Sequence, residues 1–211
     1  QRRGDFRVEF VDFGNDAAWR SALSTPADLV WVESPSNPLL RITDIREVVR
    51  VAHAAGAKVA VDNTFLSPVL QQPLALGADL VVHSMTKYLN GHSDVISGAV
   101  VAATPEDATQ LAWWANALGM TGTAFDSFLV LRGLRTLHAR MAIHEQNANE
   151  LASWLNTQSG IRRVLYPGLA DHPGHATARA QQSGFGAIVT IELAGGLVAV
   201  EKFVGELQLF S

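Results

Sequence analysis

Two side chains could act together on one small aromatic ring. Asp62 closes the apolar run 58–63, and Lys87 follows the next apolar run, 78–84. A carboxylate that leaves an apolar strand is poorly solvated, so it needs a cation or hydrogen-bond donors to stay ionised. A lysine in apolar surroundings loses proton affinity and can form a Schiff base. The pair suits pyridoxal phosphate, with Asp62 keeping the ring nitrogen protonated and Lys87 holding the aldehyde carbon.

Two hydroxyl groups lie between these side chains in the sequence. Ser84 and Thr86 alternate along a segment that we expect to be extended, so both hydroxyls can face one side and donate to a phosphate. They supply half of a phosphate site. The other donors would be backbone N–H groups at a helix N-terminus, and no glycine-rich turn of that kind occurs in this sequence.

Other interpretations of the same residues stay open. An aspartate at the end of a strand also serves as a helix or turn cap, and serine and lysine are common surface residues. Ser84 and Lys87 match the S-x-x-K motif of penicillin-binding proteins. That motif starts a helix and needs companions such as K-T-G, which the sequence lacks.

A metal site is a further alternative. Its ligands would be His83, His92 and Asp94, which would imply a metal hydrolase, but their spacing fits no helical pair of ligands. We therefore expect no metal.

The adjacent residues Trp113 and Trp114 are expected to serve packing or a subunit contact and not a ligand-binding site, because tryptophan is enriched in interfaces.

The elements that must position these residues follow the rhythm of βαβ units. Short apolar runs predict strands over 28–33, 58–63, 78–84 and 95–103. Thr43 or Asp44 can cap a helix that stops at Gly56, and 67–77 reads as a loop with a short helix. Ligands of parallel sheets bind at the carboxyl ends of the strands, which lie ~4.8 Å apart. Asp62 and Lys87 follow two such ends.

The second half of the sequence predicts longer helices and then an α+β segment. A helix starts near Pro105 and is broken at Gly119 and Gly122, and 124–157 predicts one long helix or a kinked pair that bends near Gly133. An α+β segment follows, with strands over 164–166 and 187–193 and helices over 175–182 and 197–207. We place a domain boundary near residue 152, which makes 1–152 part of a large cofactor-binding domain and 153–211 an incomplete small domain.

Composition excludes several classes of protein. The 211 residues are 48% hydrophobic and 17% charged, which is too apolar for a disordered chain. No apolar run approaches the ~18 residues of a membrane helix. A net charge of -4 does not favour binding to nucleic acid. The absence of cysteine excludes disulfides, thiolate zinc sites and cysteine nucleophiles. The opening residues from Gln1 lack the features of a secretory signal, so we expect a cytoplasmic protein.

Longer motifs connect the chain to a known family. V-D-N-T-F, which contains Asp62, is followed twenty-five residues after its aspartate by Lys87 in H-S-M-T-K-Y-L-N-G-H-S-D. This pair resembles the cysteine and methionine metabolism family of pyridoxal-phosphate enzymes. The resemblance extends through VWVESPSNPLLRI, LALGADLVVHS, LAWWANALGMTGTAFDSFLVLRGLRTL and GFGAIVTIEL, which together cover essentially the whole chain.

The resemblance implies an α/β fold of the aspartate-aminotransferase type, which is fold type I. Such a fold has a mainly parallel sheet with helices on both faces, and this chain would add the start of a smaller α+β C-terminal lobe. The cofactor would be pyridoxal 5'-phosphate, and the substrates would be small amino acids. The full-length protein is expected to be a homotetramer, a dimer of dimers, with neither nucleic acid nor membrane as partner.

The resemblance also implies roles for site residues. Lys87 matches the catalytic lysine that holds the cofactor, and Asp62 matches the partner of the ring nitrogen. Ser84 and Thr86 match phosphate ligands. Asn37, in S-P-S-N-P, matches the asparagine near the ring hydroxyl.

Thr64 is expected against the face of the ring. Other parts of the family's site would precede Gln1, namely a glycine turn for the phosphate, a ring-stacking tyrosine, and a tyrosine and an arginine lent across the dimer. The arginine for the substrate carboxylate would follow Ser211. We therefore expect this chain to be the middle of a longer family member.

The LAWWAN and TGTAFDS segments favour the members of the family that make cystathionine. The expected reaction is a γ-replacement on an O-acyl-L-homoserine, in particular O-succinylhomoserine, with L-cysteine as the incoming thiol. The γ-lyase reactions on cystathionine or methionine and acylhomoserine sulfhydrylation stay open, since they share the central motifs. A non-catalytic remnant that dimerises through its long helix and tryptophans is the alternative from a different class.

Overall fold

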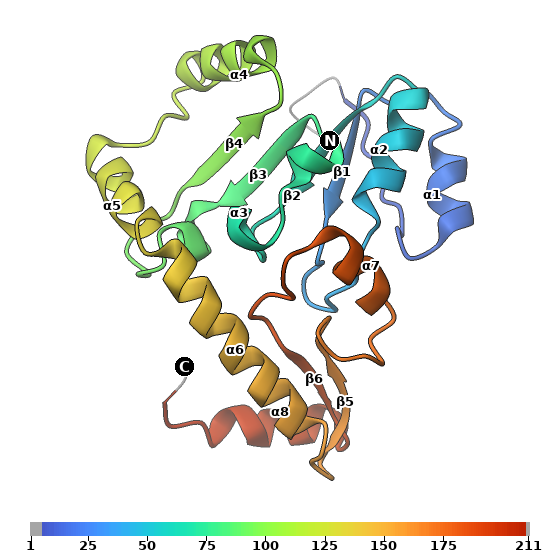
Figure 1. The fold of residues 1–211 in the computed structure, drawn as a ribbon, viewed down its shortest axis with the longest axis vertical. Coiled ribbons are helices and arrows are strands. Elements are labelled where there is room, and N and C mark those ends of the chain that lie inside the picture. Colours follow the sequence, from blue (N-terminus) through green and yellow to red (C-terminus); the bar gives the residue numbers. More distant parts are fainter. Residues whose placement is uncertain (1–5, 210–211) are drawn as a thin grey trace.

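A four-stranded sheet forms the centre of the larger part of the molecule (Figure 1). The computed structural model describes residues 6–209. Four strands lie side by side in chain order: β1 (Leu29–Glu33), β2 (Lys58–Asp62), β3 (Leu80–Ser84) and β4 (Gly98–Ala102). The first three are parallel, and β4 runs antiparallel to β3. The sheet is thus mainly parallel, as the sequence predicts.

The register of the strands aligns their carboxyl ends. Glu33 at the end of β1 pairs with Asp62 at the end of β2, and Asp62 pairs with Val82 of β3. Side chains two residues apart in a strand lie on the same face, so Ser84 shares the face of Val82. The last side chains of three neighbouring strands therefore meet at one edge of the sheet.

One face of the sheet packs against α2 (Ile45–Ala54), with α1 (Asp16–Ala22) beside it. Asp44 caps α2 as predicted, because its side chain accepts a hydrogen bond from the Glu47 amide at 3.1 Å. The buried core joins four positions of α2 to alternate positions of β1 and β2: Ile45, Val48, Val49 and Ala52 with Val30, Val32, Val59 and Val61. On the opposite face, Trp31 is 53% exposed.

Short turns follow the strands before the chain enters its long helices. They are α3 (Ser67–Leu70), the 3-10 helix η1 (Pro73–Leu76) and the π-helical turn η2 (Met85–Leu89). Then come α4 (Pro105–Ala117), α5 (Ala124–Leu134) and α6 (Leu137–Leu155). The prediction of a kinked pair over 124–157 is confirmed, and the break lies at residues 135–136, just past Gly133.

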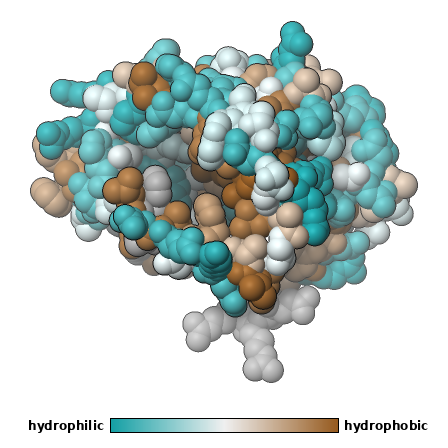
Figure 2. All heavy atoms as spheres, turned by 90° about the horizontal axis from the view of Figure 1, so that it is seen from below, coloured by the Kyte–Doolittle hydropathy of each residue, from teal (hydrophilic) through white to brown (hydrophobic). Residues whose placement is uncertain are grey.

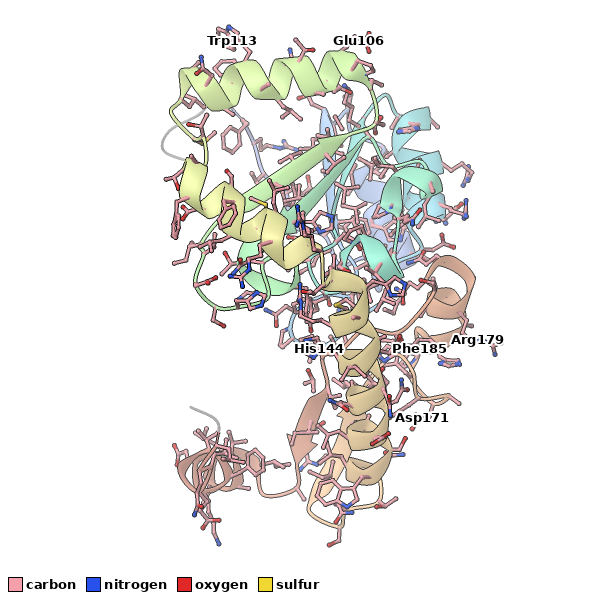
Figure 3. All side chains as sticks on the ribbon, turned by 60° about the vertical axis from the view of Figure 1, so that its left-hand side comes forward. Glu106, Trp113, His144, Asp171, Arg179 and Phe185 are labelled. Atoms are coloured by element: carbon pink, nitrogen blue, oxygen red, sulfur yellow. The ribbon has the colours of Figure 1, made fainter. Side chains whose placement is uncertain are left out.

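The C-terminal residues form a smaller α+β unit. β5 (Ile161–Leu165) and β6 (Thr190–Leu193) pair antiparallel, with α7 (His175–Gln181) between them and α8 (Gly196–Gly205) after them. This unit has its own core, in which Tyr166 and Val164 pack on Ala148 and Ala152 of α6. Figure 3 shows α6 running without a break from the large unit into the small one. The boundary near residue 152 stays a prediction.

Several apolar side chains remain exposed in the small unit. None of the α8 residues is buried, and Leu197 and Val198 are 72% and 77% exposed. Figure 2, seen from below, shows apolar side chains at several places on that side of the molecule. Among residues 6–209, no helix combines the length and apolar character that a membrane span requires.

Candidate active site

Hydrogen bonds join the ends of β2 and β3 at the aligned edge of the sheet. The Asp62 carboxylate accepts a hydrogen bond from the backbone amide of Thr64 at 2.9 Å. The Thr64 hydroxyl in turn accepts one from the backbone amide of Ser84 at 2.8 Å. All three residues are half-buried. The structure thus brings together three of the six predicted site residues, with Thr64 as the link between the two strands.

Lys87 lies in η2, three residues beyond Ser84. Its backbone angles, φ -92° and ψ -122°, depart from helical values inside the turn, so the chain is kinked at the lysine itself. Lys87 is exposed among residues 6–209, because the turn carries it past the end of β3. The expectation of apolar surroundings for this lysine stays a prediction for the longer protein.

Thr86 differs from its predicted arrangement. The extended segment ends at Ser84, and Thr86 lies in the π-helical turn, so the two residues do not alternate along one strand. The Thr86 hydroxyl contacts the backbone of Ser97, accepting from its amide at 3.1 Å and donating to its carbonyl at 3.4 Å. These contacts tie the lysine turn to the segment before β4. The sequence pattern does not reveal that the strand ends at Ser84 and that a turn begins at Met85.

Asn37 lies in the turn after β1, where its side chain is exposed. Its backbone amide interacts with the Glu33 carboxylate. Glu33 pairs in register with Asp62, but sequence reasoning assigned it no role. Burial raises the pKa of Glu33, the Asn37 amide lowers it, and the negative charge of Asp62 raises it further. The rule that singled out Asp62, a carboxylate that closes an apolar strand, would also have found Glu33.

The alternative metal site does not assemble. His83 is 4% exposed and lies on the opposite face of β3 from Ser84. His92 contacts the carbonyl of Asn90 at 2.7 Å, and Asp94 accepts a hydrogen bond from the Asn90 side chain at 2.7 Å. In the part of the chain that the structure describes, no three His, Cys, Asp or Glu side chains are grouped so that they could hold a metal ion.

His83 nevertheless adds to the electrostatics of this edge. Burial lowers its pKa, whereas the charge of Asp62 and a backbone contact with Asn63 raise it. Its Nδ1 atom is buried and has no hydrogen-bond partner among residues 6–209. Burial is the largest of these effects, so the pKa of His83 is lowered overall.

The charged groups at this edge are available to a ligand. None of the ion pairs formed within residues 6–209 uses Asp62 or Lys87. The Asp62 carboxylate can hold a protonated ring nitrogen, the exposed Lys87 amine can react with an aldehyde, and the Ser84 hydroxyl can donate to a phosphate. This donor set fits the three functional groups of pyridoxal phosphate.

Comparisons with known proteins agree with this chemistry. The family model described as Cys/Met metabolism PLP-dependent enzyme matches residues 1–211. The cystathionine gamma-synthase of Escherichia coli (strain K12) is 53% identical over 210 residues, covering 100% of this chain and 54% of that protein. A cystathionine beta-lyase of Coxiella burnetii is 44% identical over 212 residues, covering 100% of this chain and 55% of the relative.

Solved structures show the same fold. Cystathionine gamma-synthase from Xanthomonas oryzae pv. oryzae, in complex with aminoacrylate and cysteine, superposes with a TM-score of 0.93. It is 55% identical, and the match covers 95% of this chain and 52% of that one. The chain thus spans about half the length of the relatives that it matches. The chain belongs to the Cys/Met metabolism family of pyridoxal-phosphate-dependent enzymes.

Proposed function

We propose that the full-length protein is a cystathionine gamma-synthase. It would replace the γ-acyloxy group of an O-acyl-L-homoserine, in particular O-succinylhomoserine, with the sulfur of L-cysteine. The products are cystathionine and the free carboxylic acid, succinate for the succinyl substrate. The observation that carries this proposal is the pair of charges formed by Asp62, at the carboxyl end of β2, and Lys87, in the turn that follows β3, neither of which forms an ion pair within residues 6–209.

Six residues of this chain would hold the cofactor. Lys87 would bind it covalently, Asp62 would hold the proton on the ring nitrogen, and the hydroxyls of Ser84 and Thr86 would contact the phosphate. The other two are Asn37, near the ring hydroxyl, and Thr64, against the ring face. The bond from the Ser84 amide to Thr64 supports this set, because it holds two of its members at a fixed separation.

When bound, pyridoxal phosphate supplies an electron sink for negative charge that develops at the α-carbon of an amino acid. The amine of Lys87, freed when substrate binds, would act as the general base that takes the α-proton. Once the ammonium group so formed has given up that proton, the amine could take a second proton from the β-carbon, which allows the γ-acyloxy group to leave as a carboxylate. The protons return to the carbon chain after the cysteine sulfur forms its bond to the γ-carbon. Asp62 would keep its negative charge throughout.

Replacing the two charged residues tests the site. Lys87→Ala in the full-length protein should abolish turnover and the visible absorbance of the bound cofactor. Lys202→Ala is the matched control, since Lys202 lies exposed in α8. Asp62→Asn should weaken cofactor binding and slow exchange of the substrate α-proton by at least 100-fold, which is about 3 kcal/mol. A Lys87→Ala protein that kept both turnover and absorbance would refute the assignment.

The finer activity needs its own assay, since the similar proteins include both a cystathionine gamma-synthase and a cystathionine beta-lyase. O-succinyl- and O-acetylhomoserine should each be offered with cysteine and with sulfide, and cystathionine and methionine should be offered alone. We expect the fastest turnover with O-succinylhomoserine and cysteine. Faster cleavage of cystathionine or methionine would make the protein a lyase, and faster use of sulfide would make it a sulfhydrylase.

The assembly of the full-length protein is also a proposal. We expect a cytoplasmic homotetramer, a dimer of dimers, whose large domain includes residues 1–152 and whose small domain begins at residue 153. No residue of α4 is buried, and Trp113 and Trp114 pack edge to face with ring centres 4.8 Å apart. Trp113 is 60% exposed and projects from the helix in Figure 3. Sedimentation velocity of the full-length protein tests the stoichiometry, and a monomer would contradict it.

A further inference from the structure

The loop that carries Lys87 closes on itself through its own backbone. We define residues 85–91 as the lysine loop. The Asn90 amide donates to the Met85 carbonyl at 3.0 Å, and the Gly91 amide donates to the Lys87 carbonyl at 2.8 Å. Gly91 has a φ of +77°, a conformation that favours glycine. These bonds fix the shape of the loop. Besides the contacts of Thr86 with Ser97, two other segments hold the loop in position.

The first outside support is α5, which touches the lysine loop backbone to backbone. A Cβ atom on Gly133 would lie 2.2 Å from the Asn90 carbonyl oxygen and 2.8 Å from that of Leu89. Any side chain at position 133 would push the two segments apart, so only glycine allows this contact. The break between α5 and α6 follows directly after this contact.

The second support is one face of α6. Leu137 and Met141 of this face belong to a buried apolar cluster with Leu66 and Leu70, against which Tyr88 of the lysine loop packs. The Tyr88 ring also lies 5.8 Å from the ring of His144, centre to centre. His144 is labelled in Figure 3, partway along the helix. These residues recur at helical spacing, and Arg140 lies on the same face.

Arg140 joins the two supports to the loop. Its guanidinium donates to the Tyr88 carbonyl at 2.9 Å and to the Gly133 carbonyl at 2.9 Å, and its Nε donates to the Thr136 hydroxyl at 3.1 Å. It also packs against Gly91, where an added Cβ would lie 2.2 Å from Nη1. The Arg140 guanidinium thus holds the lysine loop, the end of α5 and the start of α6 together.

The charge of Arg140 has no carboxylate partner within residues 6–209. The side chain is half-buried, and burial lowers its pKa. A partly buried cation is costly unless its hydrogen bonds are well placed, and all three of these bonds go to neutral oxygens. An arginine that served only solubility would be exposed to water and would not need these three hydrogen bonds. The rigid fork of guanidinium donors is instead suited to fixing several backbone groups at once.

From this geometry we infer that Arg140 is a positioning residue for Lys87. It holds the lysine loop against Gly133 so that the Lys87 amine meets the cofactor and the substrate carbon in one orientation. The inference rests on the proposed role of Lys87 as the cofactor-binding amine. None of the three hydrogen bonds of Arg140 goes to the Lys87 side chain.

Hydrogen exchange tests the positioning without any cofactor. In the cofactor-free full-length protein, Arg140→Met should speed amide exchange of peptides covering residues 85–91 at least 10-fold. Arg135→Met is the matched control, because Arg135 is exposed one residue past the end of α5. It should leave that exchange unchanged. Equal exchange rates in the two variants would overturn the inference, as would faster exchange throughout the Arg140→Met protein.

The loaded enzyme provides the second measurement. Arg140→Met should lower kcat about 10- to 100-fold, as expected for a small misplacement of a reacting group, and change the substrate KM less than 3-fold. The visible circular dichroism of the bound cofactor should weaken in parallel. Arg140→Lys, which keeps one donor and the charge, should recover part of kcat and of the exchange protection. An unchanged kcat would overturn the inference. The two proposals can also fail separately. If Arg140→Met speeds exchange of the lysine loop but the wild type carries no cofactor on Lys87, only the proposed function is rejected.

Discussion

Gln71→Leu tests the amide network that holds the end of β1 against the segment after β2 and the small unit. The Gln71 amide nitrogen donates to the Ser34 carbonyl at 2.8 Å and to the Asn63 side chain at 3.0 Å. Its oxygen accepts from Gln181 at 3.3 Å and from Gln182 at 3.1 Å. Gln71 itself is 2% exposed. One buried side chain therefore connects four segments of the chain.

The size of the effect follows from which partners lose contact with water. The Ser34 and Asn63 residues are each 1% exposed, so their two oxygens would lose a donor that water cannot replace. Each unsatisfied group costs about 1–3 kcal/mol, or about 4 kcal/mol for both. Gln181 and Gln182 are half-buried and can turn toward water. A buried leucine offsets about 1–2 kcal/mol through its apolar surface. We expect a net loss of about 2–3 kcal/mol.

Urea denaturation of the full-length protein measures this loss as a lower midpoint with an unchanged slope. Gln72→Leu is the matched control, because Gln72 is the next residue and is exposed. Its free energy of unfolding should stay within about 0.5 kcal/mol of the wild-type value. If Gln71→Leu unfolds at the same urea concentration as Gln72→Leu, the network does not stabilise the fold and the estimate is refuted.

Two further substitutions test charge and burial elsewhere. Hydrogen bonds from Arg50 and Arg20 lower the pKa of Glu47 to about 2, so its stabilising effect is present above the unfolded value of 4.5 and is lost as the pH falls toward 2. Glu47→Gln should therefore lower the urea midpoint at pH 6 more than at pH 3, and an equal shift at both would contradict the assignment. Tyr166→Phe removes the buried hydroxyl that donates to the Gly186 carbonyl at 3.0 Å, which should lower the free energy of unfolding by about 1–3 kcal/mol. An unchanged melting curve would show that this hydrogen bond contributes nothing.

Much of the fold could be predicted because its signals are local. Asp44 marks the start of α2, whose apolar positions recur at helical spacing, and the apolar runs 28–33, 58–63 and 78–84 mark the strands. The end of the strand at Asp62 and the later position of Lys87 follow from the same pattern. Chain propensity and burial act over a few residues here, so the sequence alone is informative.

The details at the end of β3 could not be predicted. The π-helical turn that carries Thr86 and Lys87 has no sequence pattern of its own, and the exposed position of Lys87 depends on it. The place of Glu33 at the end of an apolar strand is visible in the sequence, but only the strand register shows that its carboxylate neighbours that of Asp62. These features depend on contacts between segments that are distant in the sequence.

By itself, the sequence determined the types of side chain available for chemistry, the helices and strands that carry them and the family to which they point. Only the tertiary structure decided that the Thr64 hydroxyl receives the Ser84 amide, and that Arg140, 53 residues after Lys87, fastens the lysine loop to Gly133. The reason is physical. Local propensity is set by neighbours along the chain, whereas register and close backbone contact arise when the whole core packs at once.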